Sequence, residues 1–251
     1  AAERVSRMLT VDHRALVSRA DVVYLSPPEV SLEGTPIGNG CMGMTVWPTA
    51  SSVRTQINRN DVFSSDRNHA GNHKNPVDYR GPCARIDLDV GSRVFEGDGF
   101  RQHLSLYDAE CTIEGLDLKV RCFVSSVTDL FVLEVDDRRQ HPKDIRLTVS
   151  MWRPPVVETP LKLIHPRTGE EIDTGSHVAR SIFDEVEGRI LLTQRFHETR
   201  VFHEEVYDAS SAVAACVVAD DTHIEDAEPL PIQPLWWDEG LKRVDHSPRT
   251  E

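Results

Sequence analysis

Two short polar segments carry the side chains with the clearest capacity for chemistry. One is Thr-Pro-Ile-Gly-Asn-Gly at 35–40, and the other is Gln-Ile-Asn-Arg-Asn-Asp-Val-Phe at 56–63. The candidate residues in them are Gly38, Asn39, Gly40, Asn58, Arg59 and Asp61. Amide, guanidinium and carboxylate groups beside an aromatic ring offer the directional hydrogen bonds and the apolar face that a sugar requires. Two interpretations stay open: a carbohydrate-contacting cluster, or polar groups that satisfy exposed backbone at the corner of a sheet.

Metal-binding arrangements are the next to consider. His197 and His203 are six residues apart, which spans about 20 Å along a strand, so they share an ion only across a sharp turn. Four other side chains gather in one loop-like stretch, where they either wrap an ion or form an exposed turn. These are Asp66, His69, His73 and Asp78. We expect no metal in either place.

Patterns of known catalytic and cofactor sites are also missing. No Gly-x-Ser-x-Gly elbow occurs, and the glycines of 38–43 lack the preceding strand and following helix of a dinucleotide-binding loop. Asp136 and Asp137 are adjacent, so on a strand they face opposite ways, and with Arg138 and Arg139 they indicate a charged strand end. We therefore expect no catalytic residue and no cofactor within this chain.

Charge excludes two classes of partner. Lys and Arg number 28 and Asp and Glu 41, which gives a formal net charge of −13. Nucleic acids and anionic membranes are bound by clustered positive charge, so neither is expected as a partner. The first residues lack the basic and apolar regions of a signal peptide, and no apolar run reaches the ~20 residues that span a bilayer.

The five cysteines do not form a recognisable framework. They are scattered and include no Cys-x-x-Cys pair, which fits neither a zinc site nor a dense disulfide scaffold. Cys111, Cys122 and Cys216 lie among apolar neighbours at strand-like spacing, and we expect all three to be small buried side chains.

Side chains that alternate between apolar and polar dominate the chain. Residues 84–90 and 116–124 show this period of two, which is typical of strands with one wet face. About eleven strands follow from the pattern. They are 40–47, 53–58, 84–90, 102–106, 109–113, 116–124, 130–135, 145–151, 190–196, 201–207 and 212–219. Since no amphipathic helices separate them, the sequence predicts an all-β fold, a large antiparallel β-sandwich with little helix.

The remaining segments predict turns, loops and one short helix. Glu114-Gly115 predicts a two-residue hairpin turn, and the acidic residues Asp184, Glu185 and Glu187 before Gly188 predict another turn. A helix is expected over 12–20, with Asp12 as N-cap and Leu16 and Val17 turned inward. Residues 64–82 and 153–177 are expected to be irregular. We place a sandwich domain at 1–222 and a linker or tail at 223–251.

The chain resembles a known family at these motifs. The strings Pro-Ile-Gly-Asn-Gly-Cys-Met-Gly-Met-Thr-Val-Trp and Gln-Ile-Asn-Arg-Asn-Asp-Val-Phe are similar to the N-terminal domain of glycoside hydrolase family 95-type proteins. The closer similarity is to an uncharacterised branch of these six-hairpin glycosidase-like proteins. Shorter matches follow in the same order at 78–79, 83, 86–88, 102–108 and 133–139. The resemblance covers roughly residues 12–150 well.

The resemblance implies a β-sandwich packed against a C-terminal (α/α)6 barrel that carries the catalytic carboxylates, with α-L-fucosides as one substrate class. The Gly38–Gly40 turn and the Asn58–Asp61 cluster would then lie near the junction of sandwich and barrel. We expect this chain to end before the barrel, to be inactive alone and to associate through the uncovered face. The competing hypotheses are a stand-alone carbohydrate-binding module and a hydrolase with an unrecognised carboxylate pair. Export to an extracellular or periplasmic space is the expected location.

Overall fold

The computed structural model describes residues 11–61, 83–151, 156–164, 167–200 and 205–225. Within them the chain forms three antiparallel sheets and three short helical turns, which confirms the predicted all-β sandwich. The helical turns are α1 (His13–Val17), η1 (Ser18–Ala20) and η2 (Ser31–Glu33). None of the helices in the described ranges is long and apolar enough to cross a membrane.

The first and second sheets have five strands each. The first sheet has the order β1-β6-β7-β8-β9, with β1 (Val22–Tyr24), β6 (Arg101–Ser105), β7 (Glu110–Gly115), β8 (Leu118–Val124) and β9 (Phe131–Asp137). The second sheet has the order β10-β5-β4-β3-β2, with β2 (Thr35–Gly38), β3 (Met42–Pro48), β4 (Ser52–Arg59), β5 (Ala84–Asp89) and β10 (Arg146–Met151).

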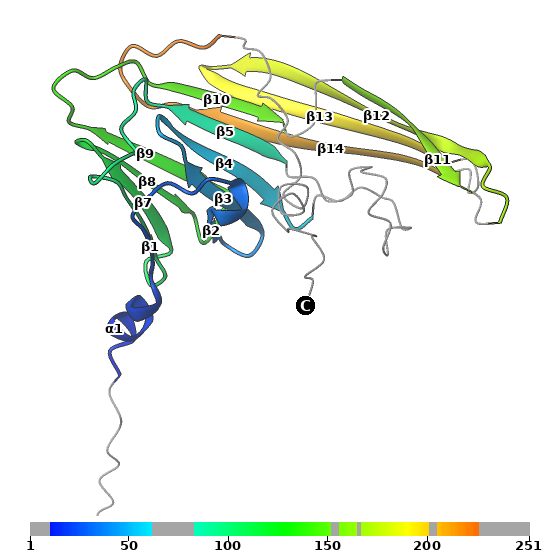
Figure 1. Ribbon diagram of the computed structural model, residues 1–251. Coiled ribbons are helices and arrows are strands. Elements are labelled where there is room, and N and C mark those ends of the chain that lie inside the picture. Colours follow the sequence, from blue (N-terminus) through cyan, green and yellow to red (C-terminus); the bar gives the residue numbers. More distant parts are fainter. Residues whose placement is uncertain (1–10, 62–82, 152–155, 165–166, 201–204, 226–251) are drawn as a thin grey trace, which may run out of the picture.

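The third sheet consists of long strands. Its order is β11-β12-β13-β14, with β11 (Val156–Ile164), β12 (Glu171–Val186), β13 (Arg189–Arg200) and β14 (Glu205–Cys216). These strands extend well past the other two sheets (Figure 1). Part of β13 lies beside β10, and Val213 of β14 packs against the main core.

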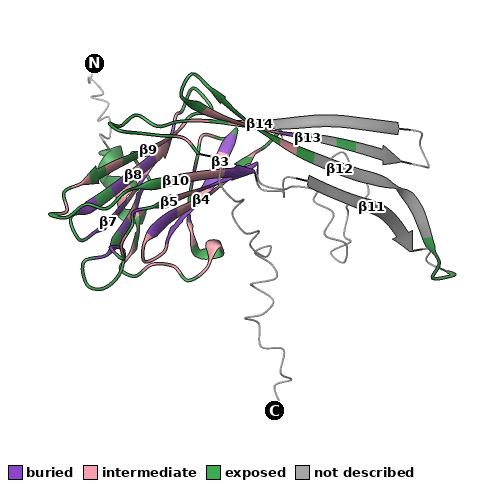
Figure 2. Ribbon diagram, turned by 90° about the horizontal axis from the view of Figure 1, so that it is seen from above, coloured by how far each residue is buried: buried purple, intermediate pink, exposed green. Residues whose placement is uncertain are grey.

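The main core lies between the first two sheets. Alternate residues of each strand face inward, as the period of two predicts. Val46, Val53 and Ala84 of the second sheet and Ile113 and Val120 of the first are fully buried. Figure 2 shows these buried positions concentrated on the strands of the two five-stranded sheets.

Several local predictions were wrong. Leu16 and Val17 are exposed, because the helix is a single turn that packs no face against the sheets, although Asp12 does cap it. Cys216 is exposed, because it sits at the end of β14. Residues within 153–177 form β11 and the start of β12, because cross-strand pairing holds them despite their prolines.

The turn between β7 and β8 also differs from its predicted place. It consists of Leu116 and Asp117, which both have positive φ, and Gly115 is still paired with Leu118. A Cβ at Gly115 would lie 2.0 Å from the Val94 carbonyl oxygen. The glycine is therefore required by close packing rather than by the turn. The second predicted turn is confirmed at Glu187-Gly188, where both residues have positive φ, but Asp184 and Glu185 are paired with β13 as part of β12.

Other predictions fall partly outside the described residues. Residues 205–207 of one candidate strand and 212–216 of the next belong to a single strand, β14, whereas 201–204 lie outside the described residues. The expected loop 64–82, with Asp66, His69, His73 and Asp78, lies outside the described residues, as does His203. Most of the expected tail at 223–251 lies outside them too.

Candidate functional site

The fold brings the two polar segments together at one corner of the second sheet. Cross-strand pairing aligns Gly38 with Gly43 and Gly43 with Asn58, so these three residues form a row on β2, β3 and β4. The neighbouring row, Ile37, Met44 and Ile57, faces the core. Because successive side chains on a strand alternate, the row with Asn58 faces away from the core. All six candidate residues therefore lie at this corner.

Asn39 is committed to holding the corner together. Its side-chain amide donates to the carbonyl oxygens of Ser125 (2.9 Å) and Thr128 (3.2 Å) in the connection between β8 and β9. Its Oδ1 accepts from the backbone N–H groups of Cys41 (3.0 Å) and Met42 (2.8 Å). With both amide hydrogens and the oxygen engaged, Asn39 joins the two five-stranded sheets.

Arg59 is likewise engaged in ion pairs. Its Nε and Nη2 donate to the two carboxylate oxygens of Asp61, each at 2.8 Å, and its Nη1 donates to Asp129 of the β8–β9 connection. The hydrogen bond from Arg59 holds the pKa of Asp61 below its ordinary value, and both carboxylates raise the pKa of Arg59. Asp61 therefore stays ionised, which is the opposite of what a general acid needs at neutral pH.

Asn60 fixes the turn that follows β4. Its backbone N–H donates to the Cys41 carbonyl oxygen (3.0 Å), and its side-chain amide donates to the Gly40 carbonyl oxygen (3.1 Å). Gly40 itself has φ +93°, a conformation that L side chains rarely adopt. One backbone and one side-chain hydrogen bond from this asparagine thus connect the glycine turn to the end of β4.

Asn58 is the candidate residue with a free side chain. Among the residues that the structure describes, its amide has no hydrogen-bond partner. A shallow hollow of about 320 Å³ lies beside it, lined by the glycine turn, Gly43, Asn58, Arg59 and Asn60. Two glycines next to an exposed amide leave the backbone open to a ligand, and an amide offers both donors and an acceptor. The corner therefore combines one binding group with a rigid support.

The glycines around the hollow differ in their structural role. A Cβ at Gly38 would lie 2.7 Å from the Met42 carbonyl oxygen, so packing requires glycine there. At Gly43 the nearest atom to a Cβ would be the Ile37 carbonyl oxygen at 3.9 Å, which is ordinary contact. Alanine is thus compatible with the fold at 43, where it would narrow the hollow beside Asn58.

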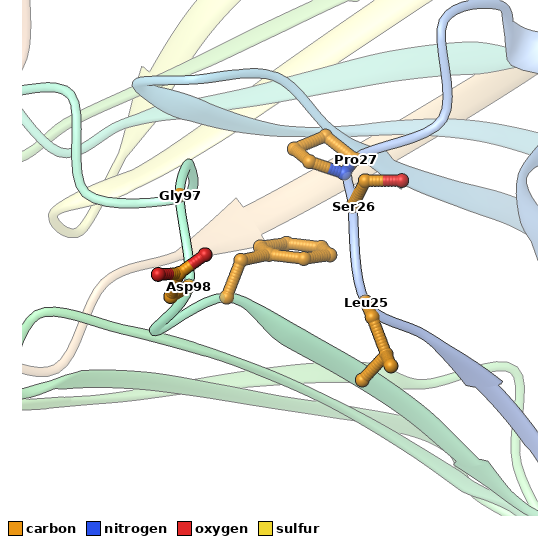
Figure 3. Close-up of a pocket in the computed structure, with 6 residues that line it drawn as sticks. Leu25, Ser26, Pro27, Gly97 and Asp98 are labelled. Carbon is orange, nitrogen blue, oxygen red and sulfur yellow. The ribbon is translucent and has the colours of Figure 1, made fainter.

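A second hollow lies at another edge of the sandwich (Figure 3). It has a volume of about 420 Å³ and is lined by Leu25, Ser26, Pro27, Gly97, Asp98 and Phe100. The segment that follows β1 forms one side, and the loop that precedes β6 forms the other (Figure 3). About seventy residues separate the two segments in the sequence, and neither carries a motif, so sequence analysis did not find this hollow.

The sequence analysis also missed part of the first corner. Ser125, Thr128 and Asp129 reach it from the β8–β9 connection, and no pattern in the sequence links them to residues 38–61. Only the packing of one sheet on the other brings them there. Within the described ranges no three His, Cys, Asp or Glu side chains are grouped so as to hold a metal ion.

These features define a class of protein, an antiparallel β-sandwich with a polar corner built from the β2–β3 turn and the end of β4. Residues 23–206 match the family described as a domain of unknown function (DUF5703), which is more than half of the chain. The chain therefore belongs to this family. A comparison with curated proteins finds no match.

Proposed function

We propose that this chain is a non-catalytic β-sandwich of a glycoside hydrolase-like protein of the family 95, six-hairpin type. In this role it supports a C-terminal helical barrel, supplied by a longer polypeptide, that hydrolyses glycosidic bonds, with α-L-fucosides as one candidate substrate class. The observation that carries the proposal is the corner itself. There the two segments that resemble family 95-type proteins, 35–40 and 56–63, meet in one hydrogen-bonded structure.

The chemistry of the corner favours a structural role for this sandwich over a catalytic role. A glycosidase uses two carboxyl groups, one of which is protonated when the reaction begins. Here Asp61 and Asp129 both pair with Arg59, and the pKa of Asp61 is lowered by its hydrogen bond from Arg59. The ionised Asp61 holds Arg59 in place and does not protonate a leaving group.

The test of this proposal is the reading frame downstream of codon 251, together with an activity assay. We expect the frame to continue through several hundred residues of paired helices. The 251-residue chain should release no aryl alcohol from aryl-α-L-fucoside or other aryl glycosides, whereas the longer polypeptide should. Hydrolysis by the 251-residue chain alone would refute the non-catalytic role, and a frame without a helical barrel would refute the supporting role.

A second candidate function is a stand-alone carbohydrate-binding module that uses the free amide of Asn58. Two variants test it: Asn58→Ala removes the amide, and Gly43→Ala places a methyl group beside it without a clash. If the module binds sugar, both should lose binding on a glycan array while keeping the wild-type unfolding midpoint. Gln140→Ala removes an exposed amide far from the corner and should bind like wild type. Equal binding by all four proteins, or by none, would reject this function.

A further inference from the structure

Two of the five cysteines face each other in the core. The register of the β7–β8 hairpin pairs Cys111 directly with Cys122, and both side chains are fully buried. Cys122 Sγ lies 3.5 Å from the Cys111 carbonyl oxygen, to which it donates. Since directly opposed residues share one face of a sheet, the two thiols are neighbours.

The geometry of this pair suits a covalent bond. Opposed residues of an antiparallel pair have Cα atoms about 4.5–5.5 Å apart, and a disulfide requires about 4.4–6.8 Å. The register of the hairpin therefore places the two cysteines at a separation that a disulfide can span. In the described ranges, neither Cys41, Cys83 nor Cys216 is paired in register with another cysteine.

We propose that Cys111 and Cys122 form a cross-strand disulfide when the chain folds in the presence of a small-molecule disulfide. The thiolate of one of the two cysteines attacks one sulfur of the oxidant and releases one thiolate, which leaves a mixed disulfide on that cysteine. The thiolate of the other cysteine then attacks the protein sulfur of the mixed disulfide and releases the second. Two protein thiols are oxidised, one disulfide oxidant is reduced to two thiols, and the two protons pass to those leaving groups.

Burial fixes the order of events. Because neither sulfur is reachable from solvent in the folded chain, oxidation precedes the packing of β7 and β8 against the second sheet. Once the sheets have packed, the same burial shields the disulfide from reductants. The exposed cysteines, Cys41 and Cys216, remain open to solvent throughout.

The experiment compares refolding with and without oxidant. The chain with Cys41→Ala and Cys216→Ala, which lacks both exposed thiols, is refolded from denaturant either in a mixture of oxidised and reduced glutathione or with a reductant alone. Each product is then unfolded, alkylated at its remaining free thiols and digested with trypsin. We expect peptides 102–119 and 122–138 to be recovered as one disulfide-linked species. The thermal midpoint of this oxidised chain should exceed that of the chain refolded with reductant by about 5–10 °C.

Two variants in the same background act as controls. Cys122→Ala should abolish both the linked peptides and the difference between the two midpoints, whereas Cys83→Ala, which removes the remaining buried thiol, should change neither. Recovery of Cys111 and Cys122 as separate alkylated peptides after oxidative refolding would overturn the proposal. A link from either residue to Cys83 would overturn it equally.

Discussion

Single residues at the polar corner divide into supporting and available groups. The side chains of Asn39, Asn60 and Arg59 donate hydrogen bonds to other residues of the chain. The Asn58 side chain, in contrast, has no hydrogen-bond partner among the described residues. The sequence places all of them in dense polar strings but does not separate these roles, because the role depends on which carbonyl oxygens lie within reach.

Asn39→Ala tests the supporting role. The change removes four hydrogen bonds that hold the β2–β3 turn and the β8–β9 connection, and we expect a loss of about 1–3 kcal/mol in the free energy of unfolding, measured in urea. Asn39→Asp keeps the acceptor for Cys41 and Met42 but loses the donors, so its loss should be intermediate. An Asn39→Ala chain as stable as wild type would show that water replaces these bonds without cost.

At the level of elements, the charged end of β9 anchors the connection to β10. Arg139 donates to both oxygens of Asp137 (2.8 and 2.6 Å), to the Val90 carbonyl oxygen (2.9 Å) and to the Ser92 hydroxyl (2.6 Å). Asp136 pairs with Arg138 in the open, where both side chains are exposed. The sequence prediction of a charged strand end is confirmed, and the structure adds that one of the two pairs, Arg139 with Asp137, is partly buried.

The partly buried pair of Asp137 and Arg139 predicts a pH dependence of stability. The hydrogen bond from Arg139 lowers the pKa of Asp137, so its stabilisation is complete above the unfolded pKa of about 3.9 and is lost as the pH falls through the lower folded value. At pH 7, Asp137→Asn should cost about 1–3 kcal/mol in unfolding free energy, and the difference from wild type should shrink below about pH 4.

Asp136→Asn is the matched control, because it removes the same charge one residue away. Its unfolding midpoint should stay near that of wild type at every pH, since exposed ion pairs contribute little. If the two variants gave equal losses at pH 7, burial of the Asp137 pair would not be the source of the effect.

At the scale of the molecule, the third sheet and the segment that follows β14 leave apolar side chains uncovered. Within the described residues these include Val186, Val217 and Val218, of which Val218 is 95% exposed. Exposed apolar surface of this kind favours association.

We therefore predict that the isolated chain self-associates. Light scattering across a concentration series should show a mass that rises above 28.3 kDa, and a dye that reports exposed apolar surface should bind. A monodisperse monomer without dye binding at all concentrations would contradict this prediction and weaken the proposed supporting role.

The sequence by itself determined the all-β class, the positions of most strands in the first two sheets and the polar strings at 35–40 and 56–63, because a period of two and clustered turn residues are local properties. Only the tertiary structure decided that β11 and β12 are strands, and that close packing against Val94 requires glycine at position 115. The same holds for the hydrogen bonds by which Ser125 and Asp129 complete the corner, and for the pairing of Cys111 with Cys122. Each of these depends on which residues are brought together by strand pairing or sheet packing, and such contacts leave no periodic pattern in a single sequence.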